Sequence, residues 1–156
     1  MWRFSWIAVV VLVLDQLTKV AATNYLTQPG EIVLAPFLNL VLVHNTGAAF
    51  GFLSRASGWQ NIFFITVAVA ACGFILWMIR RLNSQDKLLA AGLMLVLGGA
   101  LGNLIDRLIH GYVIDFIDFY YGSWHWPAFN AADSAITVGA MLLLFDALGA
   151  GVHNRK

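Results

Sequence analysis

The stretch that decides the fold is Leu88–Ile109, LLAAGLMLVLGGALGNLIDRLI. It is long enough to cross the hydrocarbon core of a bilayer, which takes about 20 residues of apolar helix. Its strongly polar side chains, Asn103, Asp106 and Arg107, gather toward its C-terminal end. Such groups are costly inside a membrane, so their presence calls for a physical reason. The stretch therefore predicts a transmembrane helix whose C-terminal end contributes polar residues to a functional site.

Three further apolar runs flank this one, at about residues 4–22, 61–79 and 132–150. Of the 156 residues, 60% are hydrophobic and 11% are charged, a composition that is rare in soluble domains. We therefore expect an all-α membrane protein with four transmembrane helices, forming a single domain over residues 1–156. A net charge of +1 provides no basic surface for nucleic acid, so no nucleic-acid partner is expected.

The positive charges predict the orientation of the four runs. Positive side chains near the ends of membrane spans favour the cytoplasmic side. They lie before the first run, between the second and third, and after the fourth, at Arg3, Arg80, Arg81, Lys87, Arg155 and Lys156. Both termini are therefore expected in the cytoplasm, and residues 23–60 and 110–131 on the outer side.

The first outer segment has the pattern of extended structure. Phe37–His44, FLNLVLVH, is rich in β-branched and large residues and too short to span a bilayer. Asn45–Gly51, NTGAAFG, then reads as a turn-rich stretch that a peptide could approach closely. We expect an outer β segment at about residues 31–56. It must lie at the interface or against the helices, because unpaired amides are not tolerated in hydrocarbon.

Two polar features lie inside the predicted spans. Asp15 and Lys19 are four residues apart, so they share a helical face and could simply neutralise each other, or could support an outer site. Gly99, Asn103 and Arg107 form a second stripe at intervals of four. Glycine alone would suggest close helix packing. We favour a functional stripe, because Arg107 offers planar donors suited to a carbonyl or carboxylate.

Candidate acids lie in the second outer segment. Asp115 and Asp118 alternate with apolar residues and could be solvated acids of a loop over residues 110–131. Asp133 follows Asn130 at the start of the fourth run, where the two could form an N-terminal cap. Taken alone, Asp133 is as well explained by capping as by catalysis, but the topology brings it to the same side of the membrane as Asp115.

A pair of nearby carboxylates suggests a specific chemistry. Two close acids cannot both ionise cheaply, so they share a proton and titrate as a coupled pair. One can then activate water while the other protonates an amide, as in aspartic proteases, with no metal or cofactor. The scattered histidines, His44, His110 and His125, lack the spacing of a metal site. Ser134 has no neighbouring base to make it a nucleophile.

Five motifs together resemble lipoprotein signal peptidase, also called signal peptidase II, a bacterial inner-membrane aspartic peptidase. The resemblance spans nearly the whole chain and follows the family's order of motifs. The motifs are Asp15–Lys19 (DQLTK), His44–Gly51 (HNTGAAFG), Gly98–Arg107 (GGALGNLIDR), Val113–Phe116 (VIDF) and Phe129–Ser134 (FNAADS).

The resemblance implies roles for particular residues. It makes Asp115 and Asp133 the catalytic pair and gives Asp15 and Lys19 a supporting role. The residues that it implies line or shape the site are Asn45, Gly99, Asn103, Arg107 and Asn130. It also implies that the outer β segment forms a β-cradle on the membrane surface, and that neither a cofactor nor a metal is needed.

The same resemblance implies a substrate and a location. The expected substrate is a prolipoprotein signal peptide whose lipobox cysteine carries a diacylglyceryl group, cut on the N-terminal side of that cysteine. The active site would face the periplasmic or outer side of the bacterial inner membrane, among membrane lipids. A monomer is expected, because one four-helix unit can satisfy its own polar residues.

Two other classes of protein remain as alternatives at this point. A small transporter or channel subunit could use Asp15, Lys19, Asp106 and Arg107 as an ion or proton path, although the most suggestive acids lie at the outer face and no internal repeat is visible. A non-catalytic scaffold could use the glycine-rich faces for assembly. Replacing Asp115 or Asp133 would then change assembly rather than turnover.

Overall fold

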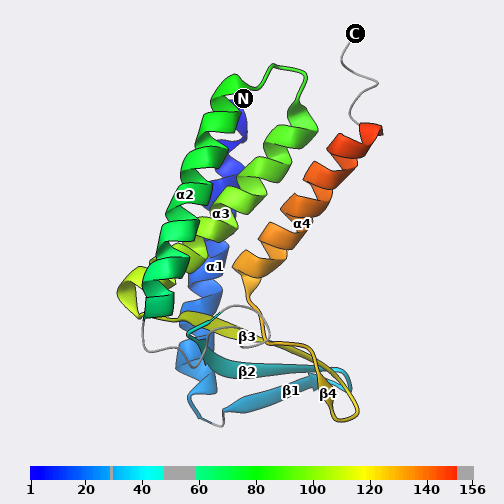
Figure 1. Ribbon diagram of the computed structural model, residues 1–156. Helices are drawn as coiled ribbons and strands as arrows, with labels where there is room; N and C mark the ends of the chain where they lie inside the picture. Colours follow the sequence, from blue (N-terminus) through cyan, green and yellow to red (C-terminus); the bar gives the residue numbers. More distant parts are fainter. Residues whose placement is uncertain (29, 48–58, 151–156) are drawn as a thin grey trace.

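The computed structural model describes residues 1–28, 30–47 and 59–150 of the chain. A bundle of four helices makes up most of the molecule, and a four-stranded antiparallel sheet lies across one end of the bundle (Figure 1). This arrangement confirms the fold class expected from the sequence. It also places the sheet beyond the ends of the helices, where the outer segments were expected.

Among the described residues, four helices are long and apolar enough to cross a membrane. A short 3₁₀ turn, η1 (Trp2–Phe4), leads into the first, and a π turn, η3 (Asp146–Ala150), follows the fourth. The helices are α1 (Ser5–Leu26), α2 (Trp59–Arg81), α3 (Lys87–Ile109) and α4 (Ala131–Phe145). The apolar run predicted at residues 4–22 is thus shorter than α1, which continues to Leu26 and ends close to the sheet.

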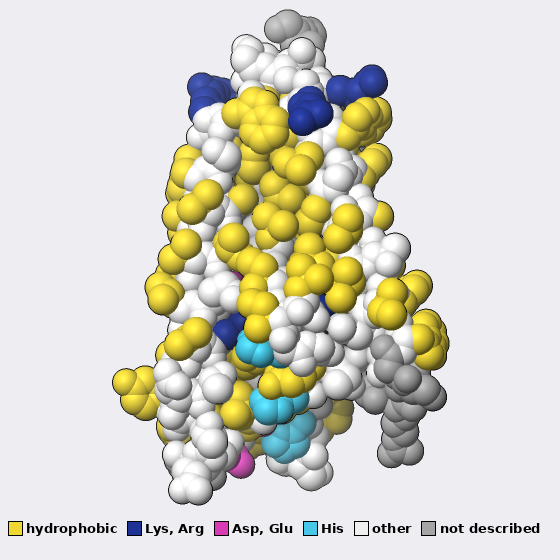
Figure 2. Space-filling view, turned by 90° about the vertical axis from the view of Figure 1, so that its left-hand side faces the viewer, with side chains coloured by type: hydrophobic (Ala, Val, Ile, Leu, Met, Phe, Trp, Pro, Cys, Tyr) yellow, Lys and Arg dark blue, Asp and Glu magenta, His cyan; other side chains and the backbone are white. Residues whose placement is uncertain are grey.

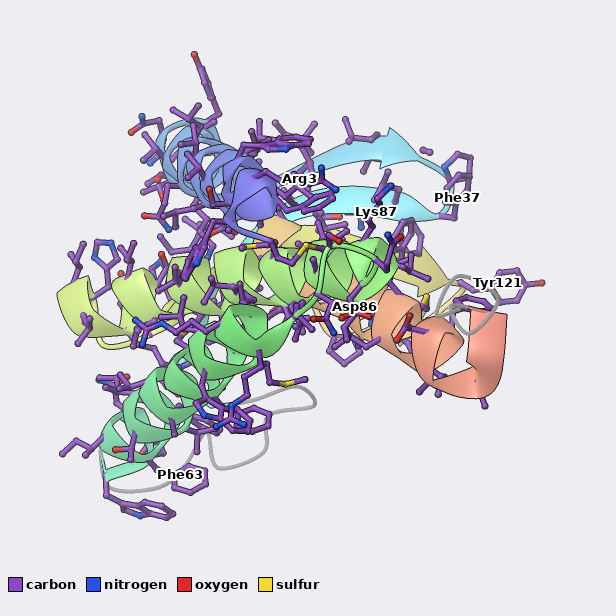
Figure 3. All side chains as sticks on the ribbon, turned by 90° about the horizontal axis from the view of Figure 1, so that it is seen from above. Arg3, Phe37, Phe63, Asp86, Lys87 and Tyr121 are labelled. Atoms are coloured by element: carbon purple, nitrogen blue, oxygen red, sulfur yellow. The ribbon has the colours of Figure 1, made fainter. Side chains whose placement is uncertain are left out.

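Helix α3 is the central helix of the bundle. In its most apolar stretch 56% of the residues are buried, against 17% in each of the other three helices. Aliphatic side chains of α1, α2 and α3 form one core cluster, in which Met94 and Ile79 are almost completely buried. Seen along the bundle in Figure 3, α3 lies between α1 and α2. A residue on α3 can therefore contact several elements at once.

Glycines allow α4 to lie directly against α3. A Cβ added to Gly92 would meet the backbone oxygen of Gly139 at 3.1 Å, and one added to Gly139 would meet that of Gly92 at 2.8 Å. Side chains at these positions would push the helices apart, so the glycines permit close backbone approach. This contact lies toward the end of the bundle away from the sheet, and a second such contact, described below, lies near the site.

The sheet has the strand order β1-β2-β3-β4, and all its neighbours are antiparallel. Its strands are β1 (Glu31–Ala35), β2 (Leu38–Asn45), β3 (Val113–Tyr121) and β4 (Trp124–His125). The extended structure predicted around Phe37–His44 is present as β2. The remainder of the predicted β segment, residues 48–56, lies outside the described residues.

Strand β3 corrects the prediction of a loop over residues 110–131. Its sequence, VIDFIDFYY, alternates and is rich in β-branched and aromatic residues, which is the pattern of a strand. After a tip at Gly122, with φ of 62°, the chain returns along β3, and Phe129 pairs with Ile117. We call residues 113–129 the hairpin.

The two ends of the bundle differ in charge. On the face in Figure 2, Lys and Arg side chains gather at the end away from the sheet, hydrophobic side chains cover the middle, and histidines lie toward the sheet. The N-terminus and the far end of α4 also lie at the end away from the sheet (Figure 1). This is consistent with the expected topology. Arg155 and Lys156, also expected at that end, lie outside the described residues.

Candidate active site

A cavity of about 650 Å³ lies where the sheet meets α3 and α4. Both candidate acids, Asp115 and Asp133, line it. Its other polar walls come from Asn45, Asn103, Arg107, Ser134 and Thr137, and its larger apolar walls from Val113, Trp126, Phe129, Ile136 and Val138. Segments far apart in the sequence thus converge on one cavity, and four of the five residues expected to shape the site, all but Gly99, lie in it or contact its acids.

Asp115 enters the cavity from β3. Its side chain is buried, and both carboxyl oxygens accept hydrogen bonds from amide groups. Asn130 Nδ2 donates to Oδ1 at 2.7 Å, and Asn45 Nδ2 donates to Oδ2 at 2.9 Å. Asp115 is therefore not the solvated loop acid that the sequence allowed, but a carboxyl group held in a defined orientation.

Burial raises the pKa of Asp115 to about 7. Removal from water disfavours the charged carboxylate, and the nearby charge of Asp133 acts in the same direction. The donated hydrogen bonds of Asn45 and Asn130 oppose this rise in pKa, as does the positive charge of Lys19. Asp115 is thus a carboxyl group that can hold or release a proton near neutral pH, which suits general acid–base chemistry.

Asp133 both caps a helix and faces the cavity. Its backbone N–H donates to Asn130 Oδ1 at 2.9 Å, and its Oδ2 accepts the backbone N–H of Asn130 at 3.2 Å, which completes a capping box. Its Oδ1 accepts a hydrogen bond from Asn103 Nδ2 at 2.8 Å. The two interpretations of Asp133 are therefore compatible, because the cap fixes the position of an acid that still lines the cavity.

Asn130 links the two acids. Its side-chain oxygen and backbone N–H bond Asp133, while its side-chain amide bonds Asp115. The same amide lies within 3.2 Å of Asn103 Oδ1 and of the carbonyl oxygen of Ile114. Asn130 is fully buried, so these bonds replace water completely. Asn130 therefore helps to fix the position of the two acids relative to each other.

Lys19 lies behind the cavity with three acceptors around its ammonium group. Nζ is 2.8 Å from Asp15 Oδ2, 2.8 Å from Asp106 Oδ2 and 3.0 Å from Asn103 Oδ1. All three of its N–H donors can thus be satisfied, as a buried ammonium group requires. The predicted pairing of Asp15 with Lys19 is present, but it is one part of a larger network that reaches Asn103.

Gln16 and Asp106 complete this network, although neither was among the residues expected at the site. Gln16 Nε2 lies 3.2 Å from Asp15 Oδ2 and 3.0 Å from Asp106 Oδ1, so it joins the two acids. Asp106 Oδ2 also accepts the backbone N–H of Ile114 at 3.1 Å. Asp106 thereby fixes the start of β3, one residue before Asp115. These hydrogen bonds join residues of α1, α3 and β3 that are far apart in the sequence, so only the tertiary structure reveals them.

Arg107 holds the end of β2 against α3. It donates from Nη2 to the carbonyl oxygen of Gly47 at 3.1 Å, while Gly47 N–H donates to Asn45 Oδ1 at 3.0 Å. The guanidinium group also lies over the ring of Phe64 on α2, 5.0 Å from its centroid. Arg107 thus supports the turn that orients Asn45 toward Asp115, and it remains part of the cavity wall.

Gly99 shapes the site from outside the cavity. A Cβ at this position would collide with the backbone oxygen of Ala132 and would lie 2.7 Å from Ile136 Cγ1. The glycine therefore lets the first turn of α4, which contains Asp133, pack against α3. For Gly99 the packing interpretation agrees with the structure, whereas Asn103 and Arg107 of the same stripe do reach the cavity.

Asp118 belongs to a separate cluster. It is buried on β3 and lies 2.8 Å from His125 Nδ1, and the His125 ring stacks on Tyr120 with centroids 5.4 Å apart. Asn39 Nδ2 lies 3.4 Å from its carboxylate. The solvated interpretation is wrong for this acid too. Asp118 is not among the residues that line the cavity.

The alternative chemistries find little support in the described part of the chain. Within residues 1–28, 30–47 and 59–150, no group of three or more His, Cys, Asp or Glu side chains is placed to hold a metal ion. Ser134 lines the cavity, but its hydroxyl donates to the backbone oxygen of Asn130 at 3.0 Å. The site thus offers two acids and a set of amides, an arrangement suited to adding water to an amide bond.

Comparison with known proteins gives a consistent result. The family model described as signal peptidase (SPase) II matches residues 7–149. The lipoprotein signal peptidase of Paraburkholderia phymatum is 53% identical over 142 residues, which cover 91% of this chain and 85% of that protein. The lipoprotein signal peptidases of Burkholderia mallei and Burkholderia pseudomallei are each 52% identical over the same length and coverage.

Solved structures agree with these similarities. A bacterial membrane enzyme determined at 2.3 Å resolution superposes with a TM-score of 0.81 and 31% identity, covering 100% of this chain and 93% of that chain. A second bacterial membrane enzyme, determined at 1.9 Å resolution, gives a TM-score of 0.80 and 30% identity, covering 95% of this chain and 94% of that one. The similarity therefore includes both the helices and the sheet.

Proposed function

Since the chain belongs to the signal peptidase II family, we propose that it is a membrane aspartic peptidase that removes signal peptides from prolipoproteins. Its substrates are prolipoproteins whose cysteine carries a diacylglyceryl group, and cleavage takes place on the N-terminal side of that cysteine. The observation on which this rests is the position of Asp115 and Asp133 on one cavity, held together by Asn130.

The proposed reaction uses the two acids in complementary states. The ionised carboxylate removes a proton from water, which attacks the carbonyl carbon of the scissile amide. The protonated acid donates to the carbonyl oxygen, and a proton then passes to the leaving amine as the C–N bond breaks. Burial keeps the pKa of Asp115 near 7, so one proton can be shared by the pair at neutral pH.

The cavity also suits a substrate that arrives within the membrane. Val138 of α4 lines the cavity and is 49% exposed, so the cavity borders a helix surface that faces lipid. A signal helix and two acyl chains can approach sideways along such a surface, while the scissile amide reaches the polar end near the acids. Trp126 and Phe129 supply an apolar wall beside that polar end.

The location follows from the same arrangement. We propose that the sheet and the acids lie at the outer face of the bacterial inner membrane, with both termini in the cytoplasm. The support for this orientation is the gathering of Lys and Arg side chains at the end away from the sheet (Figure 2). The whole chain acts as one integral membrane domain, a monomer surrounded by membrane lipids.

The test is cleavage of a purified diacylglyceryl-modified prolipoprotein by the wild-type chain in detergent. Asp115→Asn and Asp133→Asn should each remain folded and lose activity by at least about 10²-fold, because each removes one half of the acid–base pair. The matched control is Asp118→Asn, a buried acid on the same strand that does not line the cavity. It should retain activity within about threefold of wild type, since neither acid of the cavity is changed.

The outcomes separate the classes of function. If wild type cleaves before the lipidated cysteine and only the two cavity variants are inactive, the peptidase assignment and the catalytic pair both stand. Full activity in Asp115→Asn and Asp133→Asn would remove the pair from the mechanism. A wild-type chain that never cleaves would instead favour a transporter, for which ion flux through proteoliposomes is the corresponding assay.

A further inference from the structure

The two candidate acids differ in what lies behind them. Asp115 accepts hydrogen bonds from the neutral amides of Asn45 and Asn130. Asp133 accepts one from Asn103, whose own side-chain oxygen receives the Lys19 ammonium group at 3.0 Å. A chain of contacts therefore runs from the buried Lys19 ammonium group through the Asn103 amide to Asp133. Within the described part of the chain, neither of the amides that donate to Asp115 is shown bonded to a cation.

We propose that Lys19 is a positioning residue that acts through the Asn103 side chain to keep the negative charge of the pair on Asp133, leaving the shared proton on Asp115. This rests on the proposed function and assigns a distinct role to each acid. Asp133 then activates the water, and Asp115 protonates the carbonyl oxygen of the substrate.

The orientation of the Asn103 amide carries the first step. Its oxygen faces the Lys19 ammonium group at 3.0 Å and the Asn130 amide at 3.2 Å, while its nitrogen donates to Asp133 at 2.8 Å. A flipped amide would direct N–H groups at a cation and an oxygen at a carboxylate. The charges on both sides therefore select one orientation, in which Asn103 can only donate to Asp133.

Polarisation carries the second step. An ammonium group bonded to an amide oxygen draws electron density toward that oxygen, and the amide N–H becomes a stronger donor. A stronger donor favours the charged form of the carboxylate that it bonds. Lys19 is almost completely buried, so bulk solvent does little to weaken its effect on the Asn103 oxygen.

Other charges near Asp133 do not duplicate the contact made by Lys19. They lie on α1, α3 and β3 and are Asp15, Asp106, Arg107 and Asp115. Arg107 is the other nearby cation, but it donates to the backbone oxygens of Gly47 and Asn103. Asp15 and Asp106 bind the Lys19 ammonium group, so they hold it in place.

The test must remove the cation without changing the net charge of the buried network, and Asp15, the other acid bound to Lys19, keeps its hydrogen bonds from the Ala132 N–H and from Gln16. The double variant Lys19→Met/Asp106→Asn removes both partners of one ion pair, and Asp106→Asn alone is the matched control. The measurement is the pH dependence of kcat/KM for the diacylglyceryl-modified prolipoprotein. In the double variant, the acid limb of the pH profile, where kcat/KM falls toward low pH, should move up by about one pH unit relative to wild type. At pH values below that limb, kcat/KM of the double variant should be about tenfold lower than that of wild type.

The control distinguishes this role from a purely structural one. Asp106→Asn retains Lys19 and should not move the acid limb upward, whereas a general loss of packing would lower kcat/KM at every pH without moving either limb. Lys19→Arg retains the positive charge and should keep the limb within about half a pH unit of wild type, since the cation still faces the amide. An unchanged acid limb in the double variant overturns the proposal.

A second measurement does not depend on Lys19 variants or on cleavage. Infrared difference spectra at about pH 6 report protonated carboxyl groups directly, at a pH below the raised pKa of Asp115. The absorption band of the protonated carboxyl group should persist in Asp133→Asn and disappear in Asp115→Asn. The reverse pattern places the proton on Asp133 and overturns the proposal. A wild-type chain that does not cleave would defeat the proposed function alone, because this spectrum would still report where the proton lies.

Discussion

The Asp15 carboxylate accepts the backbone N–H of Ala132 at 2.9 Å, which joins the middle of α1 to the first turn of α4. Asp15 therefore satisfies a helix-end donor that the Asn130 cap does not reach. Its other oxygen binds Lys19 at 2.8 Å. A single buried carboxylate thus positions the helix turn that contains Asp133 and also the cation behind it.

This relationship predicts a large loss of stability in Asp15→Leu. The variant leaves the buried Ala132 N–H without a partner and removes one of the two carboxylates that bind the Lys19 ammonium group, which costs about 3–5 kcal/mol. Thermal unfolding in detergent measures the effect. Glu31→Gln, an exposed acid on β1, is the control and should change stability by less than about 0.5 kcal/mol. Equal melting temperatures for Asp15→Leu and wild type would contradict the role given to Asp15.

A second prediction concerns the close contact of α3 with α4. Gly99→Val should destabilise the protein by about 1–3 kcal/mol and reduce cleavage, because its side chain would collide with Ala132 and Ile136 and displace Asp133. Gly73→Ala on α2 is the matched control, since a Cβ there has no neighbour within 4 Å. It should be neutral or stabilising by up to about 1 kcal/mol, because alanine favours helix.

The pKa of Asp115 predicts the alkaline limit of activity. Above about pH 7 the free enzyme loses the proton that the pair needs, so kcat/KM should fall as the pH rises through that value. The measurement is the pH dependence of cleavage at substrate concentrations well below KM. A rate that stays constant up to pH 9 would contradict the need for a protonated acid.

The same pKa predicts the pH dependence of stability. A carboxyl group whose pKa is higher in the folded state binds more protons when folded, so its contribution to stability declines as the pH rises from about 4 to about 7. Asp115→Asn removes that decline. Its melting temperature relative to wild type should therefore be higher at pH 8 than at pH 4, and a difference of the opposite sign would show that Asp115 is stabilised as a carboxylate.

A final prediction concerns metals. Activity of the wild-type chain should be unaffected by millimolar chelator, because the proposed chemistry uses two acids and water only. Loss of cleavage on chelation, restored by one added divalent ion, would instead require a metal-activated water. The matched measurement is the chelator sensitivity of a metal-dependent peptidase under the same detergent conditions.

The helices were predictable from the sequence because hydrocarbon imposes a strong and local requirement. Each apolar run had to be a helix, since no other single segment can satisfy its backbone there. Strand β3 was missed because its stability comes from pairing with β2, about 70 residues earlier in the chain. A pairing partner at that distance leaves no local periodicity beyond a short alternation.

The site was predictable in part for a related reason. Asp115, Asp133 and the asparagines around them form short motifs that the family resemblance picks out. Their connections were not predictable: the bond from Asp15 to Ala132 and that from Asp106 to Ile114 join different elements. Gln16 lies inside the DQLTK motif, but its role was not predictable, because its contacts with Asp15 and Asp106 form only when α1 packs on α3.

The hairpin brings Asp115 and Asn130 together and holds the rest of its length away from them. Phe129 pairs with Ile117, so the two arms of the hairpin are already joined close to the acids. The chain turns at Gly122, farther from the acids, and Tyr121 beside it projects beyond the bundle (Figure 3). The tip can therefore lengthen, shorten or change composition while the acids keep their spacing. Such a layout separates a segment whose length does not affect the spacing of the acids from the segment that sets that spacing.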